Sequence, residues 1–141
     1  MYIEHIRLKN FRNFIDENVE FCPGVNIIYG ANAQGKTNLL EAIWLFGGGH
    51  SFRNAKENEL INFNSESAEI ETDFYSHDYE HNSVIKYSRG KKEIYINQIR
   101  KSGAELAQRF SAVVFSPEHM TLVKNGPAER RKFLDGAIAR E

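Results

Sequence analysis

The sequence is poor in cysteine and has no long apolar run. Cys22 is the only cysteine in 141 residues, so the chain forms no internal disulfide and cannot build a cysteine metal site by itself. A single cysteine favours a reducing compartment. No apolar run approaches the ~20 residues of a membrane span, and the first residues lack the basic and apolar segments of a signal peptide. We therefore expect a cytoplasmic protein that does not cross a membrane.

The sequence also lacks a surplus of positive charge. Its 18 Lys and Arg residues stand against 19 Asp and Glu residues, which gives a formal net charge of −1. Bulk charge therefore gives no support to nucleic-acid binding, and any DNA contact would need a local basic patch. Two such patches lie at residues 89–92 and 130–132. Acidic residues interleave with the basic ones along the chain, so a solvated face is the simpler explanation of each patch.

The composition that is present is ordinary for a globular protein, with 41% hydrophobic and 26% charged residues in a length that suits one domain. The run 25–29 is typical of a strand buried on both faces, and residues 69–96 are typical of an antiparallel meander. We therefore expect an α/β fold. The expected strands cover residues 2–9 (an edge-type strand), 15–21, 25–29, 69–75, 83–87, 93–96 and 112–115. The expected helices begin at Thr37, Asn54, Ser102 and Gly126.

The strongest pattern in the sequence is a loop bracketed by glycines. Residues 30–37 match G-x-x-x-x-G-K-[ST] in full. They stand between the apolar run 25–29 and an amphipathic helix, and strand–loop–helix is the arrangement in which this pattern binds phosphate. Polyphosphate is a dense anion that needs many donors close by. Glycines let the backbone turn its N–H groups inward, and the positive N-terminal end of the helix adds to them.

The same pattern assigns roles to single residues. Lys36 places a cation on the β- and γ-phosphates, and the Thr37 hydroxyl is expected to bind Mg²⁺. We therefore expect ATP and Mg²⁺ as the ligands of this chain. The expected nucleotide-binding residues of the loop are Gly30, Ala31, Asn32, Ala33, Gln34, Gly35, Lys36, Thr37 and Asn38.

Several segments resemble one protein family. Residues 6–14 are similar to the start of the SMC and RecF branch of ABC-type ATPases, and residues 30–43 are similar to RecF in particular. Further segments that resemble RecF lie at 51–53, 113–118, 126–127 and 130–135. These segments stand in the family's order and span nearly the whole chain. Their combination is therefore far more specific than the phosphate loop alone.

The resemblance implies a fold and a function. The fold would be that of an ABC-type P-loop ATPase head, with residues 1–141 as its N-terminal lobe, containing a mixed sheet and an antiparallel meander. The function would be that of a cytoplasmic bacterial protein that binds ATP and DNA and forms a homodimer on ATP. It would act with RecO and RecR proteins at single-strand gaps, and would support RecA loading and the SOS response.

The resemblance also implies what this chain lacks. The family's Walker B carboxylates and signature serine have no counterpart here, so we expect them beyond Glu141. The chain would then hold half of an ATP site and no catalytic residue. We expect the full protein to be a slow ATPase, and this chain alone to bind ATP without hydrolysing it.

Four residues outside the loop resemble functional positions of the family. Arg12 and Asn13 resemble an early loop that approaches the nucleotide, although an exposed polar turn explains them nearly as well. Glu118, together with Ser116, stands where ABC-type proteins place a metal- and water-sensing loop. Helix capping is the favoured explanation there, which leaves Glu118 a weak candidate metal ligand. The role of Arg53 is left open.

Two rival hypotheses belong to other classes. A P-loop kinase or small-molecule phosphotransferase would need an acceptor pocket and lid arginines, for which Arg89 and Arg100 are candidates. The segment before the phosphate loop argues against it, because most small kinases place this loop after their first strand. The second rival is a binding module that uses ATP only as a conformational ligand. It differs little from our expectation that this chain alone binds ATP without hydrolysing it.

Overall fold

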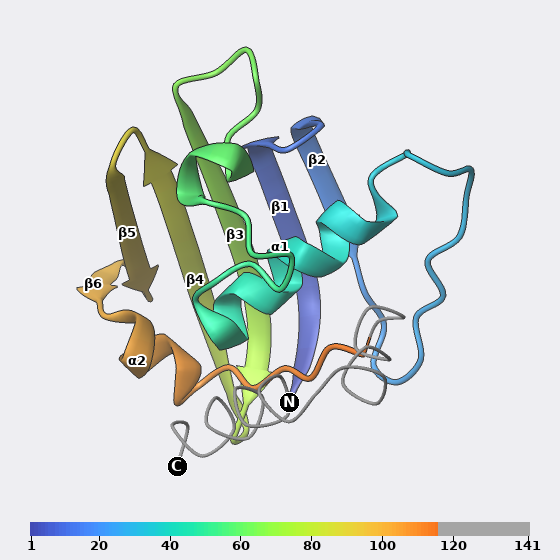
Figure 1. Cartoon of the computed structure of the whole chain (residues 1–141). Coiled ribbons are helices and arrows are strands. Elements are labelled where there is room, and N and C mark those ends of the chain that lie inside the picture. Colours follow the sequence, from blue (N-terminus) through green and yellow to red (C-terminus); the bar gives the residue numbers. More distant parts are fainter. Residues whose placement is uncertain (116–141) are drawn as a thin grey trace, which may run out of the picture.

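A computed structural model describes residues 1–115 of the chain (Figure 1). A six-stranded sheet carries one long helix, α1, across one of its faces. In chain order the elements are β1 (Tyr2–Phe11), β2 (Phe14–Glu20), α1 (Lys36–Gly48), the 3-10 helix η1 (Glu57–Leu60), β3 (Ser67–Ser76), β4 (Tyr79–Ser88), β5 (Lys91–Ile96), β6 (Ile99–Lys101) and α2 (Gly103–Ala107). Within these residues no helix is both long and apolar enough to span a membrane.

The sheet is antiparallel throughout, with the strand order β2-β1-β3-β4-β5-β6, so the expected mixed sheet is not found among residues 1–115. The predicted meander is confirmed, because β3, β4 and β5 each pair with the next strand along the chain. The prediction of an edge strand at the N-terminus is wrong, since β1 lies between β2 and β3. The charged residues of β1 reflect instead a sheet with one solvated face, where apolar and polar side chains alternate.

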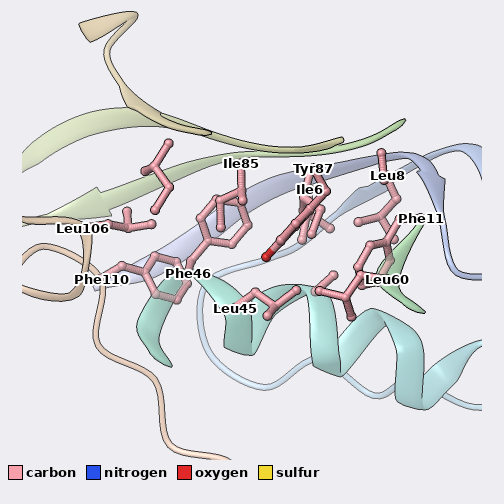
Figure 2. Close-up of a cluster of buried hydrophobic side chains, with 14 of the residues drawn as sticks. Ile6, Leu8, Phe11, Leu45, Phe46, Leu60, Ile85, Tyr87, Leu106 and Phe110 are labelled. Atoms are coloured by element: carbon pink, nitrogen blue, oxygen red, sulfur yellow. The ribbon is translucent and has the colours of Figure 1, made fainter. Parts of the chain in front are cut away.

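The core fills the space between the sheet and α1 (Figure 2). Ile6 and Leu8 of β1 and Ile85 of β4 point from the sheet toward the helix, and each is 0% exposed. Leu45 and Phe46 meet them from α1. This packing buries enough apolar surface to hold the helix diagonally across the strands, since each fully buried side chain of this kind contributes roughly 1.5–3 kcal/mol.

The opposite face of the sheet is polar, and its charged side chains pair with one another. Arg7 of β1 donates two hydrogen bonds to Asp16 of β2, at 3.0 and 2.9 Å. The Lys86 ammonium of β4 lies 2.8 Å from the Glu69 carboxylate of β3. These pairs lower the pKa of Asp16 and raise that of Lys86, in each case chiefly through the hydrogen bond between the partners. The face therefore neutralises much of its own charge.

Two predicted strands are absent. Residues 25–29 and 112–115 are neither strand nor buried: Val25 is 89% exposed, Tyr29 89% and Val113 97%. The apolar pattern of both segments suits a strand, but a strand also needs a neighbour for its backbone N–H and C=O groups. In the described part of the chain, neither segment pairs with a strand. The prediction of a buried strand before the phosphate loop is therefore wrong for this structure.

The helix predictions have mixed outcomes. The main helix and its glycine stop are confirmed, because α1 ends at a left-handed Gly49. A capping box at Ser102 and Glu105 is present and starts α2. The box predicted at Asn54 is not formed, since η1 begins after Lys56 with no side-chain cap. The predicted cap at 116–118 and the helix after residue 126 lie outside the described residues.

Tyr87 yields a prediction about stability. Its side chain is 1% exposed and its phenol oxygen points toward α1, without a hydrogen-bond partner among residues 1–115 (Figure 2). A buried hydroxyl without a partner costs about 1–3 kcal/mol. We expect Tyr87→Phe to raise the free energy of unfolding by about 1 kcal/mol in urea titrations.

The same residue predicts a pH dependence. Burial raises the pKa of the Tyr87 phenol, so the folded chain keeps a proton that the unfolded chain loses at about pH 10. Folding stability must then fall as the pH rises above that value. The Phe variant should lose less stability than the parent between pH 9 and 11 (a range set by about one unit on either side of that pKa). A stability loss of equal size in both proteins would contradict the assignment.

Candidate nucleotide-binding site

The phosphate loop has the backbone that its glycines allow. Gly30 and Gly35 have φ angles of +147° and +103°, and Ala33 between them lies in the left-handed region at +64°. The Lys36 ammonium folds back over the loop and donates to the carbonyl oxygens of Gly30 and Ala31, at 2.7 and 2.6 Å. The loop backbone therefore curves around the Lys36 ammonium.

The start of α1 is arranged to receive an anion. Its N-cap is Gly35, which has no side chain to accept a hydrogen bond from the first N–H groups. The first turn contains no acidic residue. Four backbone N–H groups at a helix N-terminus lack intrahelical partners, and the helix dipole adds positive potential there. Thr37 is exposed in this turn, so its hydroxyl is accessible to a ligand.

The turn between β1 and β2 packs against the phosphate loop. A Cβ atom added at Gly35 would lie 2.7 Å from Phe14 Cζ and 2.9 Å from Asn13 Nδ2. The Asn13 side chain also accepts a hydrogen bond from Asn38 of α1, at 2.7 Å. Residues separated by more than 20 positions in sequence thus form the wall of the loop. Glycine at position 35 is required by close contact as well as by its φ angle.

A closed set of contacts surrounds the first turns of α1, and we call it the Glu41 ring. Each link is a hydrogen bond or a short stretch of backbone. The bonds run from Arg12 to Glu41, from Asn38 to Asn13, from Arg53 Nη1 to Asn38, from the Arg53 backbone N–H to Ser51, and from Ser51 Oγ to Glu41. The ring therefore joins the β1–β2 turn, α1 and the segment that follows α1.

The link between Arg12 and Glu41 is largely buried. Arg12 donates from Nε and Nη2 to the two carboxylate oxygens of Glu41, at 2.9 and 2.8 Å. The Glu41 side chain is 0% exposed and that of Arg12 is 17% exposed. Paired hydrogen bonds between a guanidinium and a carboxylate are among the strongest in proteins. Arg12 also donates from Nη1 to the backbone oxygen of Glu59, at 2.7 Å, so all three guanidinium nitrogens have partners.

One hollow adjoins the loop and a second lies next to the first. One, of about 440 Å³, is lined by loop and helix residues and by Arg53. The second, of about 840 Å³, is lined by three arginines, Arg12, Arg53 and Arg89, and by several amide side chains. Phe63 stands at the second hollow with 99% of its surface exposed. Asn38 and Arg53 line both hollows, so the two form one continuous surface.

The structure brings most of the predicted site residues together. Arg12 and Asn13 lie beside the loop and the start of α1, within the ring. Arg53, whose role the sequence left open, borders the loop from the other side. Glu118 lies outside the described residues. Arg100 belongs to β6 and lies 3.6 Å from Glu93, so it is not part of this surface.

Sequence reasoning missed Glu41 and Ser51. Both lie in segments that resemble RecF, but no motif assigns either residue a role, because one lies in the middle of a helix and the other follows a glycine stop. A carboxylate among apolar helix residues was the available signal, since Glu41 stands between Leu40 and Ala42. A buried charge is rarely found in a helix unless it has a partner.

The family comparison agrees with this geometry. The family model described as the RecF/RecN/SMC N terminal domain matches residues 2–121. The chain belongs to this family. The predicted resemblance to the RecF branch is confirmed, and so is the fold class of an ABC-type P-loop ATPase head with α/β architecture and an antiparallel sheet.

Curated relatives carry the description DNA replication and repair protein RecF. The protein from Acetivibrio thermocellus is 44% identical over 137 residues, which cover 96% of this chain and 37% of the relative. The protein from Alkaliphilus oremlandii is 44% identical over 142 residues, covering 99% of this chain and 39% of the relative. The chain thus spans less than two fifths of the length of these relatives.

Solved structures repeat the fold. A structure of the recombination mediator protein RecF with ATPrS, in the RecFOR pathway, superposes with a TM-score of 0.92 at 44% identity. It covers 99% of this chain and 38% of the solved chain. An Smc head domain from Pyrococcus furiosus, bound to the C-terminal domain of ScpA, has a TM-score of 0.76 at 25% identity, covering 95% and 41%. The RecF/RecN/SMC lobe thus keeps its shape at low identity.

The contact at Gly35 yields a prediction. Gly35→Ala introduces a Cβ within 3 Å of Phe14 and Asn13 in addition to a positive φ angle. Gly24→Ala is a matched control, because its φ angle of +95° is similar and nothing lies within 4 Å. We expect Gly35→Ala to cost about 2 kcal/mol more than Gly24→Ala in urea unfolding, as overpacking adds roughly 1–3 kcal/mol. Losses of equal size would show that the turn does not press on the loop.

Proposed function

We propose that this chain is the ATP-binding lobe of a RecF-like DNA recombination and repair protein. The carrying observation is the phosphate loop at the uncapped N-terminus of α1, with Lys36 at its centre. Family membership supports the proposal, and so do the solved relatives whose titles name RecF with ATP or ATPrS. The nucleotide ligand is ATP with Mg²⁺.

The polyphosphate lies in the loop. Lys36 exchanges the carbonyl oxygens of Gly30 and Ala31 for the oxygens of the β- and γ-phosphates, a short movement for a flexible side chain. The N–H groups at the start of α1 donate to the same phosphates. Thr37 Oγ1 binds Mg²⁺ from the first turn of the helix. Asn13, Asn38 and the Arg53 guanidinium border the phosphates from outside the loop.

The nucleoside lies toward the larger hollow. The two hollows share Asn38 and Arg53, so a nucleotide anchored by its phosphates has its sugar and base within reach of the second one. Phe63 offers an exposed aromatic face, and Asn58 offers an amide group for the polar edges of the base. Stacking of a base on an aromatic ring contributes about 1–3 kcal/mol in other nucleic-acid sites.

In the whole protein, ATP binding by this lobe supports binding to DNA at single-strand gaps. The protein acts in the cytoplasm as an ATP-dependent homodimer with RecO and RecR proteins, and promotes RecA loading during the SOS response. Hydrolysis is slow and uses carboxylates from outside this chain. The pathway named for a solved relative supports these partners. The small-molecule kinase is disfavoured, because the family model matches from residue 2, ahead of the phosphate loop.

The Lys36 assignment is tested by Lys36→Ala. We expect ATP affinity, measured by calorimetry, to fall about ten- to a hundredfold, since a hydrogen bond to a charged group contributes about 1.5–3 kcal/mol. Circular dichroism should be unchanged, because the lysine lies at the surface of the loop. Lys56→Ala is the control, an exposed lysine outside the site, and should bind ATP as the parent does. Unchanged affinity in the Lys36 variant would exclude the proposed phosphate site.

The Thr37 assignment is tested with and without metal. We expect Thr37→Val to lower affinity for Mg·ATP on the order of tenfold while changing affinity for metal-free ATP little, because valine has the same shape but no hydroxyl oxygen. Thr37→Ser keeps the hydroxyl and should restore the metal dependence. If Thr37→Val weakens binding equally in EDTA and in Mg²⁺, the hydroxyl does not bind the metal.

A further inference from the structure

Glu41 is a buried charge that the binding of phosphate does not directly use. It is the only acidic or basic residue in the buried class among residues 1–115. Its partners are Arg12, Ser51 and Arg53, none of which belongs to the phosphate loop. A buried carboxylate is costly unless it is well paired, so its retention at this place calls for a role.

The partners of Glu41 lead to two side chains that border the loop. Arg12 is followed directly by Asn13, whose amide reaches within 3 Å of the Cβ position at Gly35. Ser51 accepts a hydrogen bond from the backbone N–H of Arg53, at 3.0 Å. The Arg53 side chain lines the hollow at the loop. Glu41 thus contacts both segments that bring polar groups to the phosphate site.

The two arginines differ in how free they are. Arg12 has its three guanidinium nitrogens engaged and a backbone φ of +53°, an uncommon conformation for a residue other than glycine. Arg53 is 41% exposed in its side chain and lies 3.8 Å from Glu41, beyond hydrogen-bond distance. One hydrogen bond, 3.0 Å to Asn38, holds its guanidinium. Arg12 therefore joins the β1–β2 turn to Glu41. Arg53 can turn toward a phosphate, because Glu41 stays paired with Arg12 when Arg53 moves.

We propose that Glu41 is a positioning residue of the nucleotide site. Its carboxylate holds the β1–β2 turn through Arg12 and the segment after α1 through Ser51, and so fixes Asn13 and Arg53 on opposite sides of the phosphate loop. This inference rests on the proposed function, because the fixed groups act on a bound nucleotide. Polar groups that support a binding site from outside it commonly determine its affinity.

The test measures ATP affinity after Glu41→Gln, a change that keeps the shape of the side chain and removes its charge. We expect affinity for Mg·ATP, measured by calorimetry, to fall on the order of tenfold. Asp16→Asn is the matched control, because Asp16 accepts the same paired hydrogen bonds from Arg7 on the opposite face of the sheet. That control should leave ATP affinity unchanged.

A second background separates positioning from general stabilisation. If Glu41 acts through Asn13 and Arg53, Glu41→Gln should change affinity less than twofold when Asn13→Ala and Arg53→Gln are already present. Coupled residues give such non-additive effects, whereas independent ones add. A tenfold loss in both backgrounds would assign Glu41 to the fold alone and overturn the proposal. Parent-like affinity of the Glu41→Gln variant would overturn it as well.

A third variant covers the case in which Glu41→Gln fails to fold, as judged by circular dichroism. Ser51→Ala removes one hydroxyl from the ring and leaves the pair between Arg12 and Glu41 in place. It should lower ATP affinity about threefold in the parent. The loss should vanish when Arg53→Gln is present, and its persistence would contradict the proposal. If the parent shows no binding that depends on Lys36, the proposed function itself fails, and the positioning role fails with it.

Discussion

The arrangement of this lobe depends on neutralising one carboxylate in its interior. Removing a charge from water costs several kcal/mol even after relaxation, so Glu41 restricts where its neighbours can lie. Arg12 reaches it only if the β1–β2 turn leans onto α1, and Ser51 reaches it only if the chain doubles back after Gly49. The apolar core could tolerate small sliding of the helix, because hydrophobic contact has no direction. The paired hydrogen bonds to Glu41 could not tolerate such sliding of the helix.

The sequence was most informative where local chemistry decides the structure. The amphipathic spacing and glycine stop of α1, the alternation in β3 to β5 and the capping box at Ser102 are all confirmed. Each of these signals acts within about ten residues, so a single sequence contains all the information it needs. The backbone of residues 30–35 is also decided locally, by glycines at fixed short spacing, while phosphate binding by this loop stays a prediction.

Apart from the capping box at Asn54, which is a local signal that was not realised, the failures share one physical cause. Residues 25–29 have the composition of a buried strand, yet Ile27 is 80% exposed, because hydrophobicity does not supply a pairing partner. The charged pattern of β1 suggested an edge although β1 is flanked by β2 and β3. The roles of Glu41 and Ser51 were missed and that of Arg53 was left open, because their partners lie in other segments. In each case the presence or absence of a contact between distant segments decides the structure, and a local sequence pattern cannot predict such a contact.

The topology also orders the events by which this lobe forms. Strands β3 to β6 pair with their sequence neighbours, so they need close only short loops. The contacts of Arg12 span 29 residues to Glu41 and 47 to the Glu59 oxygen, and Asn62 reaches back 50 residues to the Arg12 oxygen. Closing such loops early is entropically unfavourable, so we expect the meander to fold first and the phosphate site last. If the proposed site binds a nucleotide, that ligand would stabilise the part of the chain that folds last.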